Sequence, residues 1–167
     1  MNLQVSMRGG HAVLDWGAGA RRAAIGPGGI AVKGGEGDGI TPRGRFPIRE
    51  IFYRADRIAR PKARLPLRAI AENDGWCDAP TDPNYNRLVT LPYPASAEHM
   101  WRDDHLYDLV AVLGYNDDPV VPGKGSAIFL HLAKPDYAHT QGCVALAFAD
   151  ALAALEQLEP GDEIVIA

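Results

Sequence analysis

The sequence predicts a mostly β protein, a β-sandwich or partly closed barrel of mixed strands with one C-terminal helix and short extra helices. Three observations favour this class. Short segments rich in β-branched and aromatic residues alternate with glycine-rich turns. Only one stretch, near the C-terminus, has clear helical periodicity. The chain has neither repeats nor a composition change typical of a linker, so residues 1–167 are expected to form one domain.

The first half of the chain is predicted to be β structure broken by loops. Strands are expected at residues 3–7 (LQVSM), 11–16 (HAVLDW), 21–26 (RRAAIG) and 46–55 (FPIREIFYRA). Glycine-rich loops are expected at 26–29 and 33–44. Residues 71–90 are rich in Asn, Asp, Gly and Pro and are expected to be mainly loop.

The second half combines buried strands with the helix. Ser96 is expected to cap a short helix over 96–102. Long apolar runs predict strands at 105–116 (HLYDLVAVLGYN) and 126–133 (SAIFLHLA), and the chain is expected to close with a strand at 162–167. The helix over 148–158 has an apolar stripe and ends before a Pro-Gly pair; its stripe consists of Leu152, Leu155 and Leu158.

Composition and charge exclude several classes of function. The chain is 47% apolar with a net charge of −4, which favours a globular domain over a disordered or nucleic-acid-binding one. The densest basic stretch, residues 54–68, is interrupted by two prolines and an acid, so no nucleic-acid partner is expected. The glycine loop at 34–39 lacks the phosphate-binding pattern. No leader peptide or membrane span is visible, so a cytoplasmic protein without a membrane partner is expected.

The stretch IFLHLAKPDYAHTQGCVAL (128–146) carries the most reactive residues of the chain, His131, His139 and Cys143. With His105 they would supply four zinc ligands, although the spacing matches no usual zinc pattern. A redox thiol would ordinarily need a CxxC motif, which is absent. A buried histidine and a buried cysteine without chemistry are a further alternative.

Nucleophilic catalysis is the remaining interpretation of this stretch. An imidazole can take the proton of a thiol, and the thiolate attacks carbonyl groups. His131 ends a predicted buried strand, and Cys143 lies at the start of another element, where it would be exposed yet fixed. Gly142 allows close backbone approach, and the amides of Gly142 and Cys143 could face an oxyanion.

Two motifs resemble the YkuD-type L,D-transpeptidase family. TQGC, with the upstream His131, is similar to the family's His followed by [S/T]-x-G-C. ITPRGRFPIRE (40–50) is similar to its TPxGxFxI segment and also follows a glycine-rich turn. The resemblance covers roughly residues 3–167 and implies a β-sandwich that carries the cysteine beside a capping helix.

The resemblance also implies roles for these residues. Cys143 would form a thioester, and His131 would act as base and then as acid, oriented by the carbonyl of Leu132 or Ala133. The implied substrate is a peptidoglycan stem tetrapeptide, cut between the L-centre of its diamino acid and the terminal D-alanine, with no cofactor. The chain departs from the family at Gln141, at Ala145 and in its spacing, since Cys143 follows His131 by twelve positions and the usual spacing is longer.

An anionic substrate needs cationic or polar anchors. Arg102 and His105 are predicted anchors, although a surface pair of Arg102 with Asp103, Asp104 or Glu98 is an alternative. Gln141 and His139 are predicted to contact substrate, and Tyr115 to line the rim of the pocket.

The expected absence of a leader favours hydrolysis of soluble muropeptides in murein recycling, as an L,D-carboxypeptidase. A transpeptidase that forms 3→3 cross-links is the main alternative. A non-catalytic muropeptide-binding protein is a third, and the oligomeric state is left open.

Overall fold

The computed structural model describes all residues, 1–167, and places most strands in one sheet. The sheet has nine strands, in the order β11 (Leu109–Leu113), β12 (Phe129–Leu132), β13 (Val144–Leu146), β3 (Arg21–Ala24), β2 (His11–Asp15), β1 (Asn2–Arg8), β14 (Glu163–Ile166), β6 (Gly44–Tyr53) and β7 (Leu67–Ala69). Because β11 also pairs with β6, the sheet closes into a barrel and only β7 lies outside the ring. The mostly β prediction is confirmed, and of the two predicted architectures the barrel is the one observed.

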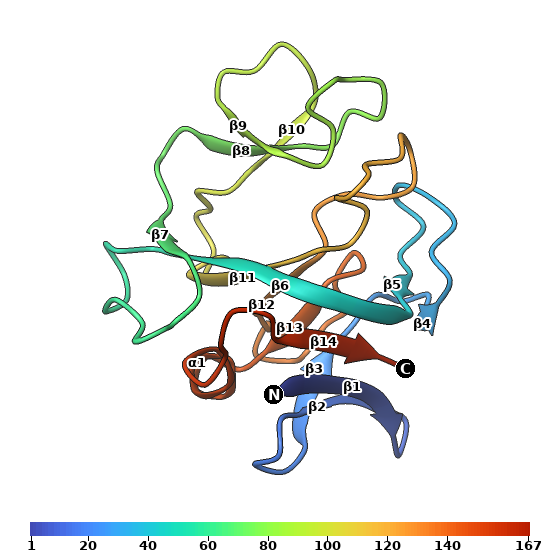
Figure 1. The fold of residues 1–167 in the computed structure, drawn as a ribbon, viewed down its shortest axis with the longest axis vertical. Coiled ribbons are helices and arrows are strands. Elements are labelled where there is room, and N and C mark those ends of the chain that lie inside the picture. The colour runs from blue at the N-terminus through green and yellow to red at the C-terminus, as the bar shows by residue number, and fades with distance from the viewer.

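A second, small sheet lies beside the barrel. It consists of β10 (Ala97–His99), β8 (Asp74–Cys77) and β9 (Leu88–Thr90). Figure 1 shows it at the top of the view, above β6 and β11. A two-stranded ladder, β4 (Ile30–Ala31) with β5 (Thr41–Pro42), brackets the glycine-rich loop.

The only helix is α1 (Phe148–Leu155). It buries Ala151, Ala154 and Leu155, and Leu158 is also buried just beyond its end. The predicted helix was too long, because the turn after Leu155 tightens: the Leu158 amide bonds to the Leu155 carbonyl at 3.3 Å. With eight residues in its one helix, the structure offers no helix suited to cross a membrane.

The prediction of short extra helices was wrong. The short helix expected at Ser96 is absent, and so are other extra helices, because residues 97–99 pair with β8 as β10. Residues 71–90 are mainly loop, as expected, and they also contain β8 and β9. At residues 97–99 cross-strand hydrogen bonds with β8 override the local sequence preference.

The core has two parts on opposite sides of the barrel wall. The larger cluster fills the barrel and includes Leu130 and Val144. The smaller cluster lies between the wall and the small sheet and includes Trp76, Phe129 and Cys143. Because side chains alternate along a strand, neighbouring residues of β12 and β13 face different clusters. The structure therefore places Cys143 outside the barrel, between its wall and the small sheet.

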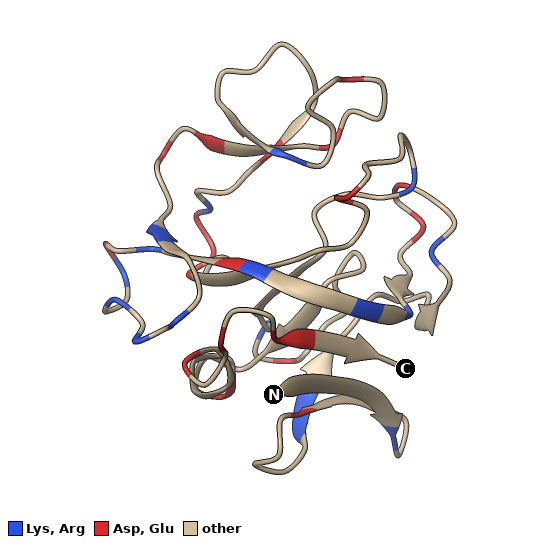
Figure 2. Ribbon diagram, in the orientation of Figure 1, with Lys and Arg blue, Asp and Glu red and all other residues tan.

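The basic stretch at 54–68 is mostly neutralised by acidic partners. Figure 2 shows these cations along the loop that follows β6 and in β7. Four of its arginines form ion pairs: Arg54 with Asp56, Arg57 with Asp108, Arg64 with Glu159, and Arg68 with Asp74. The stretch is therefore tied to the fold and is not a free polycationic surface.

Candidate active site

Strands β12 and β13 bring His131 and Cys143 to the same face of the sheet. The two strands run parallel, with His131 opposite Ala145 and Leu130 opposite Val144. Cys143 immediately precedes β13, so its side chain points to the same side as that of Ala145 and that of His131. Both side chains line one cavity of about 410 Å³, and both residues are more than nine-tenths buried.

The turn before Cys143 is held by the hydroxyl group of Thr140. This hydroxyl accepts a hydrogen bond from the Gly142 amide at 3.1 Å and donates one to the Cys143 carbonyl at 2.7 Å. Gly142 has φ +124°, and a Cβ atom there would lie 2.8 Å from the Ile40 carbonyl oxygen. The turn therefore requires a hydroxyl residue at its start and glycine before the cysteine.

The two sequence motifs meet at this turn. The Ile40 carbonyl, which packs against Gly142, also accepts a hydrogen bond from Lys33 Nζ at 3.2 Å. The neighbouring Thr41 hydroxyl accepts a hydrogen bond from the Gly26 amide at 2.9 Å. The segment that begins at Ile40 is thus the support on which the Gly142–Cys143 turn rests, which explains why two distant motifs belong to one site.

The Cys143 thiol is neutral and held by the backbone. It accepts a hydrogen bond from the Phe129 amide at 3.4 Å and donates one to the Ala127 carbonyl at 3.2 Å. Ala127 has φ +54°, an uncommon conformation for alanine that turns this carbonyl toward the thiol. Burial raises the pKa of Cys143 to about 12, so the thiol is protonated at neutral pH.

His131 is neutral as well, and its tautomer is fixed. Nδ1 lies 2.9 Å from the Leu132 carbonyl oxygen, which can only accept, so Nδ1 carries the proton and Nε2 is free to accept one. Burial lowers the pKa of His131 to about 4. The predicted orientation of this ring by a following carbonyl is confirmed for Leu132. On its other side, the ring packs edge-on against Tyr107 at 5.4 Å between centroids.

The two amides proposed for an oxyanion differ in their hydrogen bonding. The Gly142 amide is already bonded to Thr140. The Cys143 amide has no acceptor within the protein. A tetrahedral oxygen bound at Cys143 would therefore meet the Cys143 amide as its free backbone donor.

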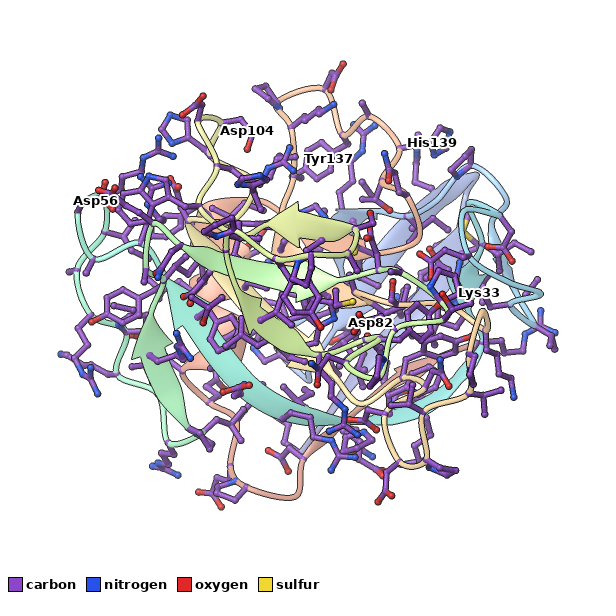
Figure 3. The ribbon with its side chains drawn as sticks, turned by 90° about the horizontal axis from the view of Figure 1, so that it is seen from above. Lys33, Asp56, Asp82, Asp104, Tyr137 and His139 are labelled. Carbon is purple, nitrogen blue, oxygen red and sulfur yellow. The ribbon has the colours of Figure 1, made fainter.

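Three of the five predicted substrate contacts line the cavity: Arg102, His139 and Gln141. The guanidinium of Arg102 is occupied by Asp104, with hydrogen bonds of 2.8 and 2.6 Å, which is the surface pairing considered from the sequence. His139 and Gln141 are exposed, and His139 Nδ1 lies 3.1 Å from the Ile25 carbonyl oxygen. Figure 3 shows His139 and Lys33 toward one end of the molecule, with Asp56 at the other.

The structure does not place the other two predicted contacts at the cavity. The side chain of His105 is 79% exposed and pairs with Asp108 at 2.7 Å. Tyr115 is buried against Phe46, and its hydroxyl donates to the Lys124 carbonyl at 2.6 Å. His105 follows a turn that aims it at solvent, and Tyr115 anchors a loop; neither lines the cavity with Cys143.

Several cavity residues were missed by the sequence analysis. Tyr107 and Glu98 line the cavity, and the Tyr107 hydroxyl donates to the Glu98 carboxylate. Nothing in the sequence pattern links these two residues, because Glu98 belongs to a strand that was predicted to be a helix. Thr140 belongs to the TQGC motif but was not predicted to have a role of its own. Its hydroxyl group, two residues before Gly142, could have indicated that it stabilises the turn.

A metal centre is not assembled from these side chains. No group of three or more His, Cys, Asp or Glu side chains is arranged to hold a metal ion. His105, the fourth ligand of the zinc alternative, points into solvent away from Cys143.

Nearly the whole chain matches one known protein family. The family model YkuD, described as the L,D-transpeptidase catalytic domain, matches residues 2–166. Neither a curated protein nor a solved structure gives a significant match.

Proposed function

Because the chain belongs to the YkuD family of L,D-transpeptidase catalytic domains, we propose that it is a cysteine acyl-enzyme peptidase in which Cys143 attacks a peptidoglycan stem tetrapeptide. The bond attacked joins the L-centre of the third residue, a diamino acid, to the terminal D-alanine. The observation that carries this proposal is the shared cavity of Cys143 and His131, whose Nδ1 is held by the Leu132 carbonyl.

The first half of the proposed reaction forms the acyl-enzyme. Nε2 of His131 takes the thiol proton as Sγ bonds to the carbonyl carbon of the substrate, and the carbonyl oxygen becomes an oxyanion beside the Cys143 amide. The oxyanion collapses as the bond to D-alanine breaks, and His131 gives its proton to the leaving amine. The product is a thioester at Cys143 and free D-alanine.

The second half of the reaction needs an acceptor. Water gives up a proton to His131 and attacks the thioester, which releases the tripeptide and restores the thiol. The modest size of the cavity supports this choice: at about 410 Å³ its volume lies near the small end of the range for ligand pockets. Its rim residues Lys134, His139 and Gln141 are exposed, which gives water access.

We therefore propose L,D-carboxypeptidase activity on soluble muropeptides, as in murein recycling. The description of the matching family favours the second candidate, transfer to an amine with formation of a 3→3 cross-link. The two reactions share the acyl-enzyme and differ only in the acceptor.

The test is digestion of a purified tetrapeptide muropeptide, followed by mass spectrometry, with Cys143→Ala as the control. Tripeptide and free D-alanine in equal amounts, absent from the control, are the expected products. A 3→3 dimer in place of tripeptide would establish the transferase. An unchanged substrate under conditions where the protein is folded would overturn both.

A further inference from the structure

Three of the six Asp, Glu, Lys and Arg side chains that line the active-site cavity are held by other residues of the protein. The cavity is lined by three acids and three basic residues, Glu36, Asp78, Glu98, Lys33, Arg102 and Lys134. Lys33 pairs with Asp38 at 2.5 Å, and Arg102 pairs with Asp104. Glu36 accepts hydrogen bonds from the hydroxyls of Tyr85 and Ser126. These residues organise the walls and have little capacity left for a ligand.

Glu98 is different, because half of its carboxylate is unused. It is half-buried in β10, and only Oε1 has a partner, the Tyr107 hydroxyl. No cation lies within ion-pair distance of Glu98. Next to β8, Asp78 Oδ1 is also buried without a hydrogen-bond partner. This wall of the cavity therefore carries two carboxyl groups without an ion-pair partner. Burial raises the pKa of Glu98, and the Tyr107 hydroxyl and the charge of Arg102 only partly oppose this shift, so a cation bound here would favour the charged carboxylate.

The same carboxylate is linked to the reacting residues. Tyr107, which Glu98 holds by its hydroxyl, packs against the ring of His131. The negative charge of Glu98 also adds to the burial that raises the pKa of Cys143. A cation bound at Glu98 would remove that contribution and favour the thiolate in the occupied site.

We infer that Glu98 receives an alkylammonium group of the bound peptide, the distal amine of the third-residue diamino acid, and thereby selects stems in which that amine is free. This inference rests on the proposed function, because the stem peptide supplies the amine. An amine that is already acylated, as in a cross-linked stem, carries no charge and leaves Glu98 uncompensated. The enzyme would then discriminate against acylated stems by the lost ion pair.

The test compares two tetrapeptides that differ only in a free or an N-acetylated distal amine. Their binding is measured by calorimetry to Cys143→Ala, so the result does not depend on turnover. We expect the free amine to bind at least about tenfold more tightly. When Glu98→Gln is added to Cys143→Ala, the ratio of the two affinities should fall close to one, mainly because the free-amine peptide binds more weakly.

Two further variants keep the result interpretable. Glu36→Gln removes the same charge from the same cavity at a carboxylate with hydroxyl partners, and it should leave the ratio unchanged. Tyr107→Phe removes the hydrogen bond to Glu98 but keeps the carboxylate, so this variant should still prefer the free-amine peptide. It provides a second test if Glu98→Gln folds poorly. The inference would be overturned if Cys143→Ala bound the two peptides with equal affinity. It would also be overturned if the preference for the free amine were unchanged by Glu98→Gln.

Cleavage by the wild type separates this inference from the proposed function. If the wild type cleaves both peptides equally well and binds them equally, the peptidase proposal stands and the role of Glu98 falls. If the wild type cleaves neither while the binding preference depends on Glu98, the ammonium site stands and the peptidase proposal falls.

Discussion

At the scale of single residues, the His131 imidazole and the Cys143 thiol are both neutral before substrate binds. Burial lowers the pKa of His131 to about 4 and raises that of Cys143 to about 12, so neither group is charged at neutral pH. In the proposed mechanism, proton transfer from Sγ to Nε2 therefore belongs to the step in which substrate reacts. The resting thiol is protected, and its reactivity depends on the positions of His131 and the Cys143 amide.

This neutral pair predicts the pH dependence of acylation. The second-order rate constant kcat/KM should show no inflection at the usual histidine pKa of about 6.5 and should fall only below about pH 5. The measurement is kcat/KM for the tetrapeptide from pH 4.5 to 8. A profile that follows a group with a pKa near 6.5 or near 8.5 would contradict the burial of these side chains.

The lowered pKa of His131 also predicts a stability effect. Below pH 6.5 the unfolded chain binds a proton at His131 that the folded protein does not bind until about pH 4, so acid destabilises the fold in this window. The contribution lost between pH 7 and pH 4 is about 3 kcal/mol. Urea unfolding of wild type and of His131→Gln at both pH values measures it: the variant should lose less stability, and equal losses would contradict the prediction.

Gly142 gives a second prediction at the residue scale. In Gly142→Ala the new Cβ would meet the Ile40 carbonyl oxygen, in addition to the cost of the positive φ angle. We expect a loss of about 2–4 kcal/mol in the free energy of unfolding and of most activity. Gly17→Ala is the matched control, because Gly17 has φ +94° with nothing near its Cβ position. Equal losses in the two variants would show that the contact with Ile40 is unimportant.

At the scale of elements, the site depends on the turn that leads into β13. Thr140→Val removes the hydroxyl that joins the Gly142 amide to the Cys143 carbonyl while it keeps the shape of the side chain. We expect kcat to fall at least about tenfold, because the Cys143 amide and thiol lose their fixed position. Thr140→Ser keeps both hydrogen bonds and should retain most activity in the same assay; a similar loss in both variants would argue against the hydroxyl.

Some of the elements that form the site could be predicted from the sequence, and others could not. The strand that carries His131 and the position of Cys143 at a boundary were predictable, because apolar runs and glycine turns are local signals. The small sheet was not, because β8, β9 and β10 are only three or four residues long, too short for a period-two pattern, and are defined by their pairing with one another. Glu98 was missed for this reason, and Tyr107 was missed because its role depends on the hydrogen bond to Glu98. His105 and Tyr115 were misplaced because turn geometry decides where they point.

At the scale of the whole molecule, closure of the barrel brings the two motifs together. The segment from Ile40 leads into β6, and the Cys143 turn leads into β13, which lies on another part of the ring. Their contact at Ile40 and Gly142 needs the complete barrel, so the site should form and melt with the whole fold. Sequence motifs alone identified both segments, whereas their physical contact became visible only in three dimensions.

The central claim is that Cys143 is the nucleophile of an acyl-enzyme. The most direct measurement is incubation of the protein with a carbapenem, whose β-lactam carbonyl traps an acyl-enzyme, followed by mass mapping of the modified peptide. We expect one adduct, on Cys143, that is lost in Cys143→Ala and forms much more slowly in His131→Gln. An unmodified Cys143, or an adduct on Cys77 in its place, would contradict the account.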